Sequence, residues 1–515
     1  MDLGVMNVDM ASNGDEVIGL CSRNAYDVVL CDYNLGDGRN GQQVLEELRF
    51  KSHLSLRSLF ILVSAEAGRN IVMSAYDSAP DDYLMKPITT QMLHKRLTRA
   101  LLQRAALTPV YDAIEKQDPH SAMDLLIDMS LAEDRHSTAA QKLLGEMFLQ
   151  HGEFLKAEKL YMSVLEVREL DWARLGLAKA KQKQGSLEQS GEWLEKIVED
   201  NYLYLPAYDV LSDNWMERGD SDKAQQVVQR SVDVSPMSIL RQKNLANLAT
   251  ENRDFTTAVD SLRKVVKLGK LSCYGTPEDN LSLLRTMSSA LESGSEFPPA
   301  VVSEAFNGVV GLEKTESLSQ QVKQAQLMYL NSRLLAIREN RDEAQELLVR
   351  AETSLAVEDS DINTEVDHVR ALIALDYPQK VEILLQRLQE IYEDDQDALQ
   401  KLDEFLDEPA SDANKAIVAE VNRAGIELYN DGAFDEALEC FDKAIKLFPK
   451  HVGLQLNTVQ ALIGKLKSNP SDESSHERCR ESLETIASTI DSGHAQYKRF
   501  AQLKNMAKTF YLPTS

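Results

Sequence analysis

Residues 424–449 of the chain read AGIELYNDGAFDEALECFDKAIKLFP, and this stretch carries the clearest structural pattern in the sequence. It holds two short helical patterns separated by Gly432, and Pro449 follows the second one. Small residues such as Gly425 and Ala437 let two antiparallel helices approach closely, and a glycine between them supplies a tight turn. Proline ends the unit because it cannot continue a helix. The stretch therefore predicts a helix–turn–helix unit.

The same unit recurs upstream with a period of about 34 residues. Small residues equivalent to Ala437 follow one another at intervals of 33 to 35 residues and are Ala122, Ala157, Ser190, Ala224 and Ala258. A further match stands at Ala344. A fixed period of this length is the sequence signature of a stacked repeat array.

The repeat resembles the tetratricopeptide repeat, a family of helix–turn–helix units that stack into a right-handed superhelix. The resemblance is good over residues 105–270, weak over 271–410 and strong again over 415–450. It predicts three regions, which are a first repeat block at 105–290, degenerate helical repeats with an acidic connection at 291–410, and a repeat with C-terminal helices at 411–515. Residues 290–300 and the acidic stretch 393–414 are interpreted as irregular connections, and a solvated helix face is the simpler interpretation of the acidic run.

Tetratricopeptide arrays bind peptides on the concave surface formed by their first helices, so the resemblance implies a protein or peptide partner. It places these residues in the groove: Lys142, Glu146, Asp209, Asp213, Lys243 and Asn247. Lys243 and Asn247 lie one helical turn apart. In some members of the family a lysine and an asparagine at these positions hold a partner's terminal carboxylate. The rest of that set is not matched here, so solvated polar residues are the simpler interpretation.

Residues 1–104 have a different pattern, in which short apolar runs alternate with amphipathic stretches. The predicted strands are 8–11, 26–33, 59–64 and 82–85, and the predicted helices are 15–24, 41–51, 70–79 and 89–106. Alternating strands and helices predict a parallel sheet with helices on both faces. Asp32, Ser64 and Lys86 fall at the carboxyl ends of predicted strands, where the chemistry of such sheets is located. Taken singly, they are a turn residue, a helix cap and a surface lysine.

Taken together, these residues resemble the receiver domain of two-component response regulators, which has a flavodoxin-like fold. The resemblance implies that a histidine kinase phosphorylates Asp32, that Ser64 turns toward the phosphoryl group and that Lys86 pairs with it. Tyr83 matches the aromatic switch position. A carboxylate is a weak nucleophile, so the transfer needs nearby positive charge, which Lys86 and Mg²⁺ would supply.

The sequence departs from the receiver family at its start. A receiver opens with an apolar strand that ends in an acidic pair which binds Mg²⁺, and Asp2 and Asp9 do not match that pair. We therefore expect the first strand to be missing, either because the start is assigned too late or because the receiver is degenerate. Only Asp32 and the backbone at Asn34 would then hold Mg²⁺, which makes this cofactor doubtful.

Composition limits the remaining possibilities. The formal net charge is −26, which disfavours nucleic acid and anionic membranes as partners because phosphate binding needs positive patches. No apolar run is long enough to span a membrane, and the start lacks the basic and apolar parts of a signal peptide. The cysteines are odd in number and scattered along the chain, so they indicate no disulfide framework and predict a reducing cytoplasm. No phosphate-binding glycine loop, histidine ligand spacing or Ser/His/Asp set is present, so we predict no enzyme.

Two hypotheses remain. In the first, the chain is a cytoplasmic response regulator with a histidine kinase as one partner, and its output is protein binding by the repeats or by a homodimer. In the second, the receiver is inactive in phosphorylation and the chain is a constitutive scaffold. An unrecognised active site in residues 271–410 is the least favoured alternative.

Overall fold

The computed structural model describes residues 7–65, 78–132, 134–301, 303–304, 320–357, 360–490 and 492–511. The chain forms two compact units, residues 1–286 and 287–515, and each unit is described by itself. The predicted helix 70–79 lies mostly outside the described residues, which resume at Ser78.

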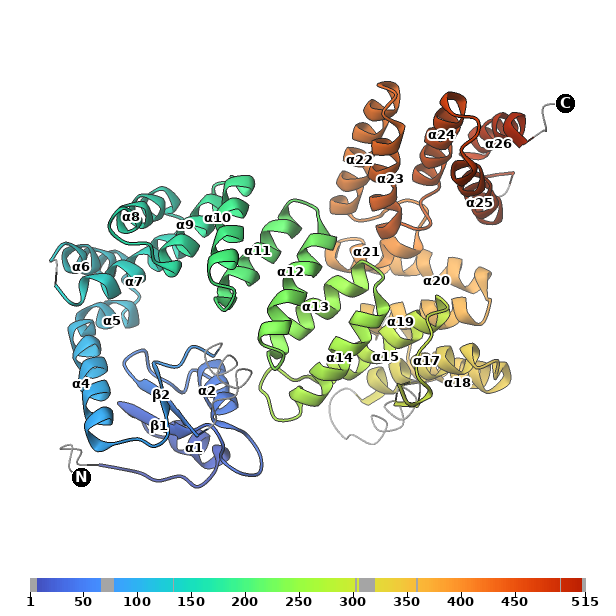
Figure 1. Ribbon diagram of the computed structural model, residues 1–515. Coiled ribbons are helices and arrows are strands. Elements are labelled where there is room, and N and C mark those ends of the chain that lie inside the picture. The colour runs from blue at the N-terminus through green and yellow to red at the C-terminus, as the bar shows by residue number, and fades with distance from the viewer. Residues whose placement is uncertain are drawn as a thin grey trace. The chain divides into compact units, whose positions relative to one another are not determined.

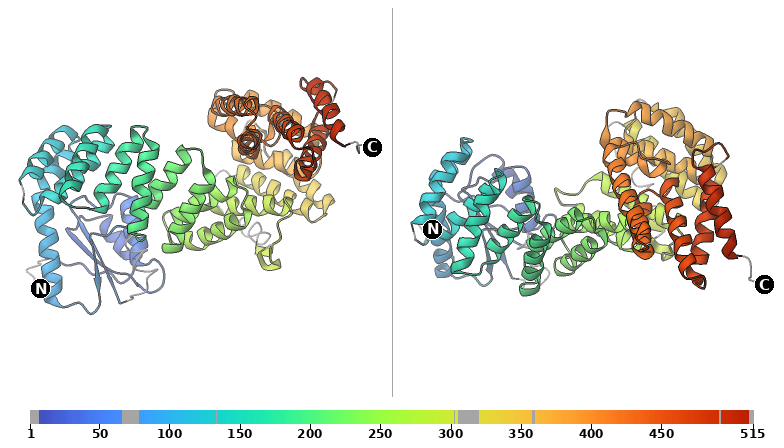
Figure 2. Two further views of the ribbon diagram at one scale, coloured as in Figure 1. Left: turned by 45° about the horizontal axis from the view of Figure 1, so that its top comes forward. Right: turned by 90° about the horizontal axis from the view of Figure 1, so that it is seen from above.

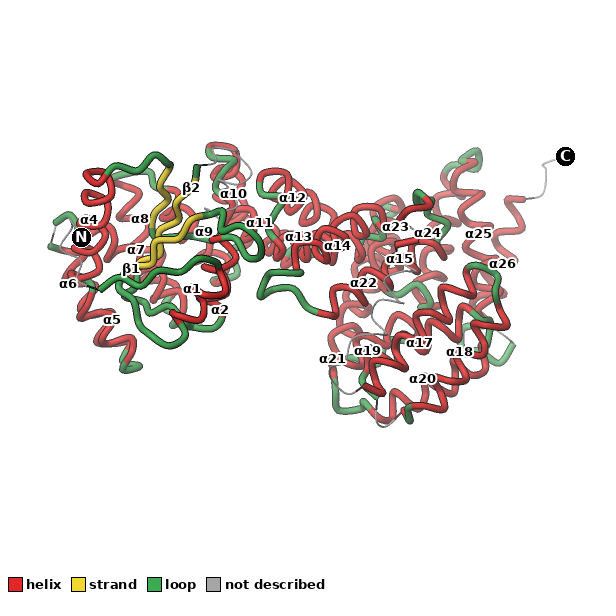
Figure 3. Tube along the Cα trace, turned by 90° about the horizontal axis from the view of Figure 1, so that it is seen from below, coloured by secondary structure: helices red, strands yellow, loops and turns green. Residues whose placement is uncertain are grey.

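The first unit opens with a three-stranded parallel sheet (Figures 1 and 3). Its strands are β1 (Val28–Asp32), β2 (Leu59–Ser64) and β3 (Asp82–Met85), in the order β1-β2-β3. All residues of β2 are buried, as expected for the central strand of a parallel sheet that is covered on both faces. The register pairs Asp32 with Val63 and Ser64 with Met85.

Helices cover both faces of this sheet. They are α1 (Gly14–Cys21), α2 (Gly41–Phe50) and α4 (Thr90–Ala106). Alternate side chains of β2 belong to two different cores, because successive side chains of a strand point to opposite faces. Phe60 and Leu62 share a buried cluster with α1 and α2. Ile61 and Val63 belong to a second cluster, against which side chains of α4 pack. This is the flavodoxin-like arrangement that the sequence predicts.

The predicted strand at residues 8–11 is wrong. These residues have no regular structure, and the side chains of Val8 and Met10 are 61% and 82% exposed. A strand forms only where a neighbouring strand accepts and donates its backbone hydrogen bonds. Among the described residues, β1 pairs with β2 alone, so residues 8–11 form no such hydrogen bonds with the sheet.

Paired helices follow the sheet. In the first unit they are α5 (Thr108–Glu115), α6 (Pro119–Leu131), α7 (Ser137–Gln150), α8 (Phe154–Val167), α9 (Asp171–Lys183), α10 (Leu187–Asp200), α11 (Leu205–Glu217), α12 (Ser221–Val234), α13 (Ile239–Glu251) and α14 (Phe255–Gly269). The next helix, α15 (Pro277–Glu292), spans the division between the units. Consecutive helices pack side by side in chain order, as a repeat array requires (Figure 2).

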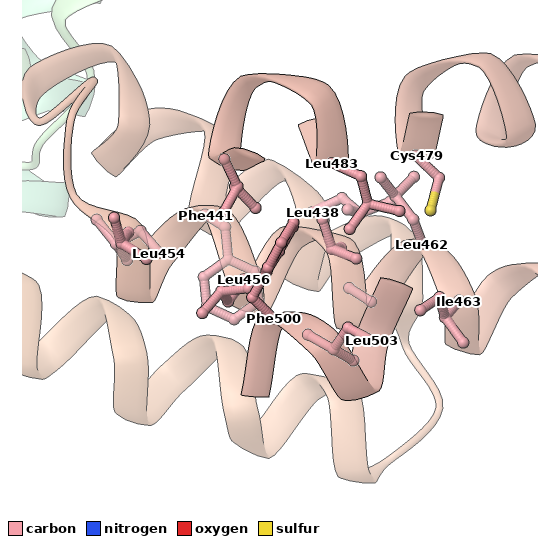
Figure 4. Packing of buried hydrophobic residues seen from close by; sticks show 14 of the residues in the cluster. Leu438, Phe441, Leu454, Leu456, Leu462, Ile463, Cys479, Leu483, Phe500 and Leu503 are labelled. Atoms are coloured by element: carbon pink, nitrogen blue, oxygen red, sulfur yellow. The ribbon is translucent and has the colours of Figure 1, made fainter. Parts of the chain in front are cut away.

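The second unit is also helical. Its further helices are α17 (Gln320–Ile337), α18 (Arg341–Ser354), α19 (Ile362–Ala374), α20 (Pro378–Ile391), α21 (Gln396–Leu402), α22 (Asp412–Asn430), α23 (Phe434–Leu447), α24 (Val452–Ser468), α25 (Glu473–Thr489) and α26 (Tyr497–Tyr511). Side chains from α23, α24, α25 and α26 form one apolar core, in which Phe441, Leu462 and Phe500 are buried (Figure 4).

Close approach of glycine to an aromatic ring holds neighbouring helices together. A Cβ atom on Gly145 or on Gly176 would overlap the ring of Tyr161, and a Cβ on Gly425 would overlap the ring of Phe441. Tyr161 and Phe441 are each 1% exposed. The glycines therefore provide the space that the aromatic side chain of the second helix fills, which explains their place in the repeat.

The turn between paired helices has one residue in the left-handed conformation. Glycine takes this place at Gly152, Gly185, Gly219 and Gly432, with φ between 75° and 81°. Other residues take it at Gln117, Arg253, Glu339 and Asp376, with φ between 58° and 62°. The same turn thus continues where the sequence pattern is weak, and loss of the glycine at positions 339 and 376 is one reason why that region looks degenerate.

The acidic connection is more ordered than the sequence predicts. Residues 396–405 are helical, and the carboxylate of Asp403 is buried. Asp403 accepts hydrogen bonds from the Ser411 hydroxyl at 2.5 Å and from the side-chain amide of Asn414 at 2.9 Å. It thereby holds Ser411, the N-cap residue of α22, so Asp403 has a structural role and is not part of a solvated face.

The left-handed turns give a stability test. We expect Glu339→Gly to raise the free energy of unfolding by about 0.5–1 kcal/mol, because a side chain at positive φ costs more than the extra freedom of glycine in the unfolded chain. Gly432→Ala, the matched opposite change, lowers it by about 1 kcal/mol. Chemical denaturation of the full chain, followed by helical circular dichroism, measures both. Destabilisation by Glu339→Gly would contradict this account.

Candidate functional site

Three strands deliver the predicted site residues to one edge of the sheet. β1 ends at Asp32, β2 ends at Ser64, and β3 ends one residue before Lys86. The backbone amide of Lys86 donates to the carbonyl of Ser64 at 2.8 Å, which joins two of these strand ends directly.

Asp32 and Lys86 form an ion pair between Oδ2 and Nζ. Their side chains are 34% and 43% exposed, so the pair remains open to solvent. The backbone amide of Asn34 donates to the other carboxylate oxygen, Oδ1, at 3.3 Å. A half-open carboxylate with a cation and a backbone N–H beside it is suited to accept a phosphoryl group, because both donors can also stabilise the oxygens that are added.

The neighbouring thiol does not compete with Asp32 as a nucleophile. Burial raises the pKa of Cys31 to about 12, and the charges of Asp32 and Cys21 act in the same direction. The thiolate is the reactive form of cysteine, so this side chain stays neutral and inert near neutral pH. All described cysteines are free thiols.

The other two predicted residues are buried. Ser64 is 2% exposed, and Tyr83 is 8% exposed. Tyr83 belongs to the same buried cluster as Val44, Leu45 and Leu48 of α2. The structure therefore brings the acid, the cation and the hydroxyl residue to one edge, and places the aromatic residue in the core beneath α2.

The start of α2 is attached to the end of β1. The amide of Gly41 donates to the carbonyl of Tyr33 at 2.9 Å, and a Cβ on Gly41 would overlap the carbonyl of Asp32. Asn40 and Gln43 form reciprocal hydrogen bonds that cap the helix. Any movement of the loop after Asp32 therefore acts on α2 directly.

The described residues do not fit a preformed Mg²⁺ site. No group of three or more acidic, histidine or cysteine side chains gathers anywhere in the described part of the chain. Asp9 accepts a hydrogen bond from the Tyr26 hydroxyl at 2.6 Å, and Asp2 lies outside the described residues. Lys86 already holds one oxygen of Asp32. One carboxylate and the backbone at Asn34 are too few ligands for a site of this hard cation.

The predicted groove residues lie on three helices. Lys142 and Glu146 are exposed on α7. Asp209 on α11 forms a two-pronged ion pair with Arg241 on α13, with both N–O distances at 2.7 Å. Lys243 pairs with Asp279 at 2.6 Å and donates to the carbonyl of Tyr274 at 2.8 Å. Two of the charges expected to meet a partner are thus already neutralised inside the chain.

A cavity of about 510 Å³ lies between α2 and the groove. Asp209, Asp213, Arg241 and Asn244 line it from the repeats. Tyr33, Gln42, Glu46 and Arg49 line it from the α/β region. The residues that sequence reasoning missed are Arg241, Asn244, Arg49 and Tyr274. The one available signal was that Arg241 follows Asp209 by 32 residues, close to one repeat period.

Comparison with known proteins agrees with this architecture. Residues 2–98 match the family model described as the response regulator receiver domain, and residues 420–451 match the one described as the tetratricopeptide repeat. The chain carries a receiver domain and tetratricopeptide repeats. Its receiver domain is 26% identical over 98 residues to chemotaxis protein CheY-3 of Vibrio cholerae, which is 19% of this chain and 74% of that protein. Chemotaxis protein CheY of Pseudomonas aeruginosa is also 26% identical, with 19% and 77% covered.

One solved structure that the chain matches is a tetratricopeptide repeat protein from Parabacteroides merdae. The match has a TM-score of 0.29 and 14% identity, and covers 52% of this chain and 98% of that one. Both matched families are non-catalytic. Among the helices of the described ranges, none combines the length and the apolar character that crossing a membrane demands.

A second cavity lies within the second unit. It has a volume of about 630 Å³ and is lined by residues of α22, α24 and α26. Arg499 donates to the side-chain oxygens of Asn457 at 2.5 Å and Gln460 at 2.9 Å. Burial lowers the pKa of Arg499. The last repeat block thus has a cavity of its own, lined by both polar and apolar side chains.

The ion pair of the receiver domain gives a second test. We expect Asp32→Asn and Lys86→Met each to change the free energy of unfolding by less than about 1 kcal/mol, because half-exposed ion pairs contribute little stability. Urea denaturation measures both, with Val44→Ala in the core as a destabilising control. A loss of several kcal/mol at Asp32 would show that the pair is structural and would contradict a chemical role.

Proposed function

We propose that the chain is a response regulator whose receiver domain accepts a phosphoryl group on Asp32 from a histidine kinase, and whose repeats bind a protein partner. The observation that carries the proposal is the half-open ion pair of Asp32 and Lys86 at the strand ends, next to Ser64. The relatives support it, since they are chemotaxis proteins of the CheY type.

In the transfer, an oxygen of Asp32 attacks the phosphorus of a phosphohistidine. The new O–P bond forms as the N–P bond breaks, and the imidazole leaves with the electron pair of that bond and takes a proton from solvent. Lys86 neutralises the incoming oxygens, and the amide of Asn34 can donate to one of them. The Ser64 hydroxyl then has a new acceptor at the end of β2. Because the described residues do not form a Mg²⁺ site, we assign no step to the metal and propose only weak Mg²⁺ binding.

The receiver is well placed to act on the repeats. α4 ends at Ala106 and α5 begins at Thr108, so a single residue separates the receiver from the first repeat helix. Two arginines also join them. Arg57 pairs with Asp112 and Glu115 of α5, and Arg104 pairs with Asp81 and donates to the Tyr111 hydroxyl. A change in the receiver therefore has a short physical route to the array.

A constitutive scaffold with an inactive receiver is the second candidate function. It is favoured by one observation, which is that the described residues contain no acidic pair beside Asp32. In that case the output is still protein binding by the repeats, but Asp32 takes up no phosphoryl group.

Phosphoryl uptake separates the two candidates. We expect intact-mass spectrometry after incubation with acetyl phosphate and Mg²⁺ to show a gain of one phosphoryl group. Asp32→Asn abolishes the gain, whereas Asp37→Asn, which changes an exposed carboxylate in the following loop, leaves it unchanged. Uptake by Asp32→Asn at the wild-type level would assign the phosphoryl group to another residue. Its absence from the wild-type chain would favour the scaffold.

A further inference from the structure

The groove of the first repeat block faces a helix of the chain's own receiver domain. The ring of Phe50, at the end of α2, meets the ring of Tyr274 edge-on, with centroids 5.9 Å apart. Tyr274 lies in the connection after α14, and its carbonyl accepts the hydrogen bond from Lys243 of the groove. Glu46 and Arg49 of α2 line the same cavity as Asp209 and Arg241. Part of the predicted partner surface is therefore covered from within.

The closeness of the two parts changes the electrostatic environment of the connection after α14. Burial raises the pKa of the Cys273 thiol, and the charges of Glu46 and Glu47 on α2 raise it further. Burial likewise raises the pKa of Tyr274; Cys273 and Glu46 act in the same direction, and Arg49 of α2 acts against them. The connection after α14 thus lies within the electrostatic field of the receiver helix.

The helix that covers the groove is also the helix attached to the acceptor. Its first residue, Gly41, lies against the Asp32 carbonyl, and Tyr33 of the same loop lines the cavity. At the other end of α2, the Arg49 side chain donates hydrogen bonds to two backbone carbonyls, those of Ser78 and Ala79. The bond to Ala79 is 2.7 Å long. Those residues lead into β3, which carries Tyr83 and precedes Lys86. A change at Asp32 or Lys86 therefore reaches α2 from both ends.

We propose that α2 is an internal ligand of the first repeat groove, so that the unphosphorylated receiver occupies the surface used by a protein partner and phosphorylation of Asp32 releases it. This inference rests on the proposed function and specifies its regulation. In this inference the coupling between the receiver and the repeats runs through α2 (Gly41–Phe50).

The contact is weak enough to be switched. Phe50 remains 62% exposed, and the cavity beside it shows that the two surfaces are not closely packed. A ligand or modification shifts such an equilibrium only by its differential free energy, so a loosely packed contact needs only a modest bias. A phosphoryl group adds negative charge on the loop after Asp32, whose Tyr33 lines the same cavity as Asp213, and like charges repel more strongly where water is partly excluded.

Cys273 is a natural reporter of this contact. The other described thiols are buried except that of Cys440, so a Cys440→Ser background leaves Cys273 as the accessible thiol. We expect Phe50→Ala, in the full chain, to increase the rate of maleimide labelling at Cys273 by about two- to tenfold, the factor that loss of an aromatic pair gives. Leu56→Ala is the matched control, since Leu56 is an exposed apolar residue of the same domain outside the cavity. Equal rates for Phe50→Ala and wild type would overturn the proposal.

A second arm tests release by phosphorylation. Labelling is repeated after incubation with acetyl phosphate and Mg²⁺, and intact mass reports phosphoryl uptake in the same sample. A faster Cys273 rate in the phosphorylated chain, absent in Asp32→Asn, supports the proposal. Phosphorylation without a change in rate overturns release and leaves the proposed function intact. If no phosphoryl group is taken up, the proposed function is contradicted, and so is release by phosphorylation. The labelling of Phe50→Ala still decides whether α2 covers the groove.

Discussion

The attachment of α2 to the end of β1 is the constraint on which the first unit depends. Gly41 lies so close to the carbonyl of Asp32 that no side chain fits between them. Its backbone amide donates a hydrogen bond to the carbonyl of Tyr33. The helix therefore cannot shift without moving the acceptor loop. At the opposite end of α2, the Arg49 side chain donates hydrogen bonds to backbone carbonyls of the segment before β3. The same ten residues thus connect the chemistry at the strand ends with the surface of the repeats.

Much of this fold follows from the sequence by elementary rules. Strands β2 and β3 begin and end at the predicted residues because each is a short apolar run bounded by turns. The helix pairs follow from small residues at a fixed period, and glycines on neighbouring helices leave the space that Tyr161 and Phe441 fill. The prediction of a strand at residues 8–11 was wrong because strand formation depends on pairing with a neighbouring strand and not on local apolar content alone. The pairs around positions 339 and 376 were obscured because Glu339 and Asp376 adopt a turn conformation that usually selects glycine.

The candidate site was predictable in part, and the groove less so. The intervals between Asp32, Ser64 and Lys86 place them at one edge of any parallel sheet with this connectivity. The register of the 34-residue repeat could also place Asp209 and Lys243 on the first helices of their repeats. It could not show that Arg241 and Asp279 neutralise them, because such pairs join residues from neighbouring elements. Nor could it show Phe50 beside Tyr274, because that contact joins parts of the chain more than 200 residues apart. With these pairs formed, a chain of net charge −26 presents a groove whose acidic residues are partly balanced from within.

The central claim is that the state of Asp32 determines whether the receiver covers the first repeat groove. Pulsed electron–electron double resonance tests it most directly, with one spin label at Ser55 on the receiver and one at Asn247 on α13. Both side chains are exposed. The labels are placed in a chain that has Cys273 and Cys440 replaced by serine. The account predicts one narrow distance distribution in the unphosphorylated chain and a broader, longer one after acetyl phosphate, with no change in Asp32→Asn. A distribution that is already broad before phosphorylation, or one that stays the same in a chain shown by mass to be phosphorylated, would contradict it.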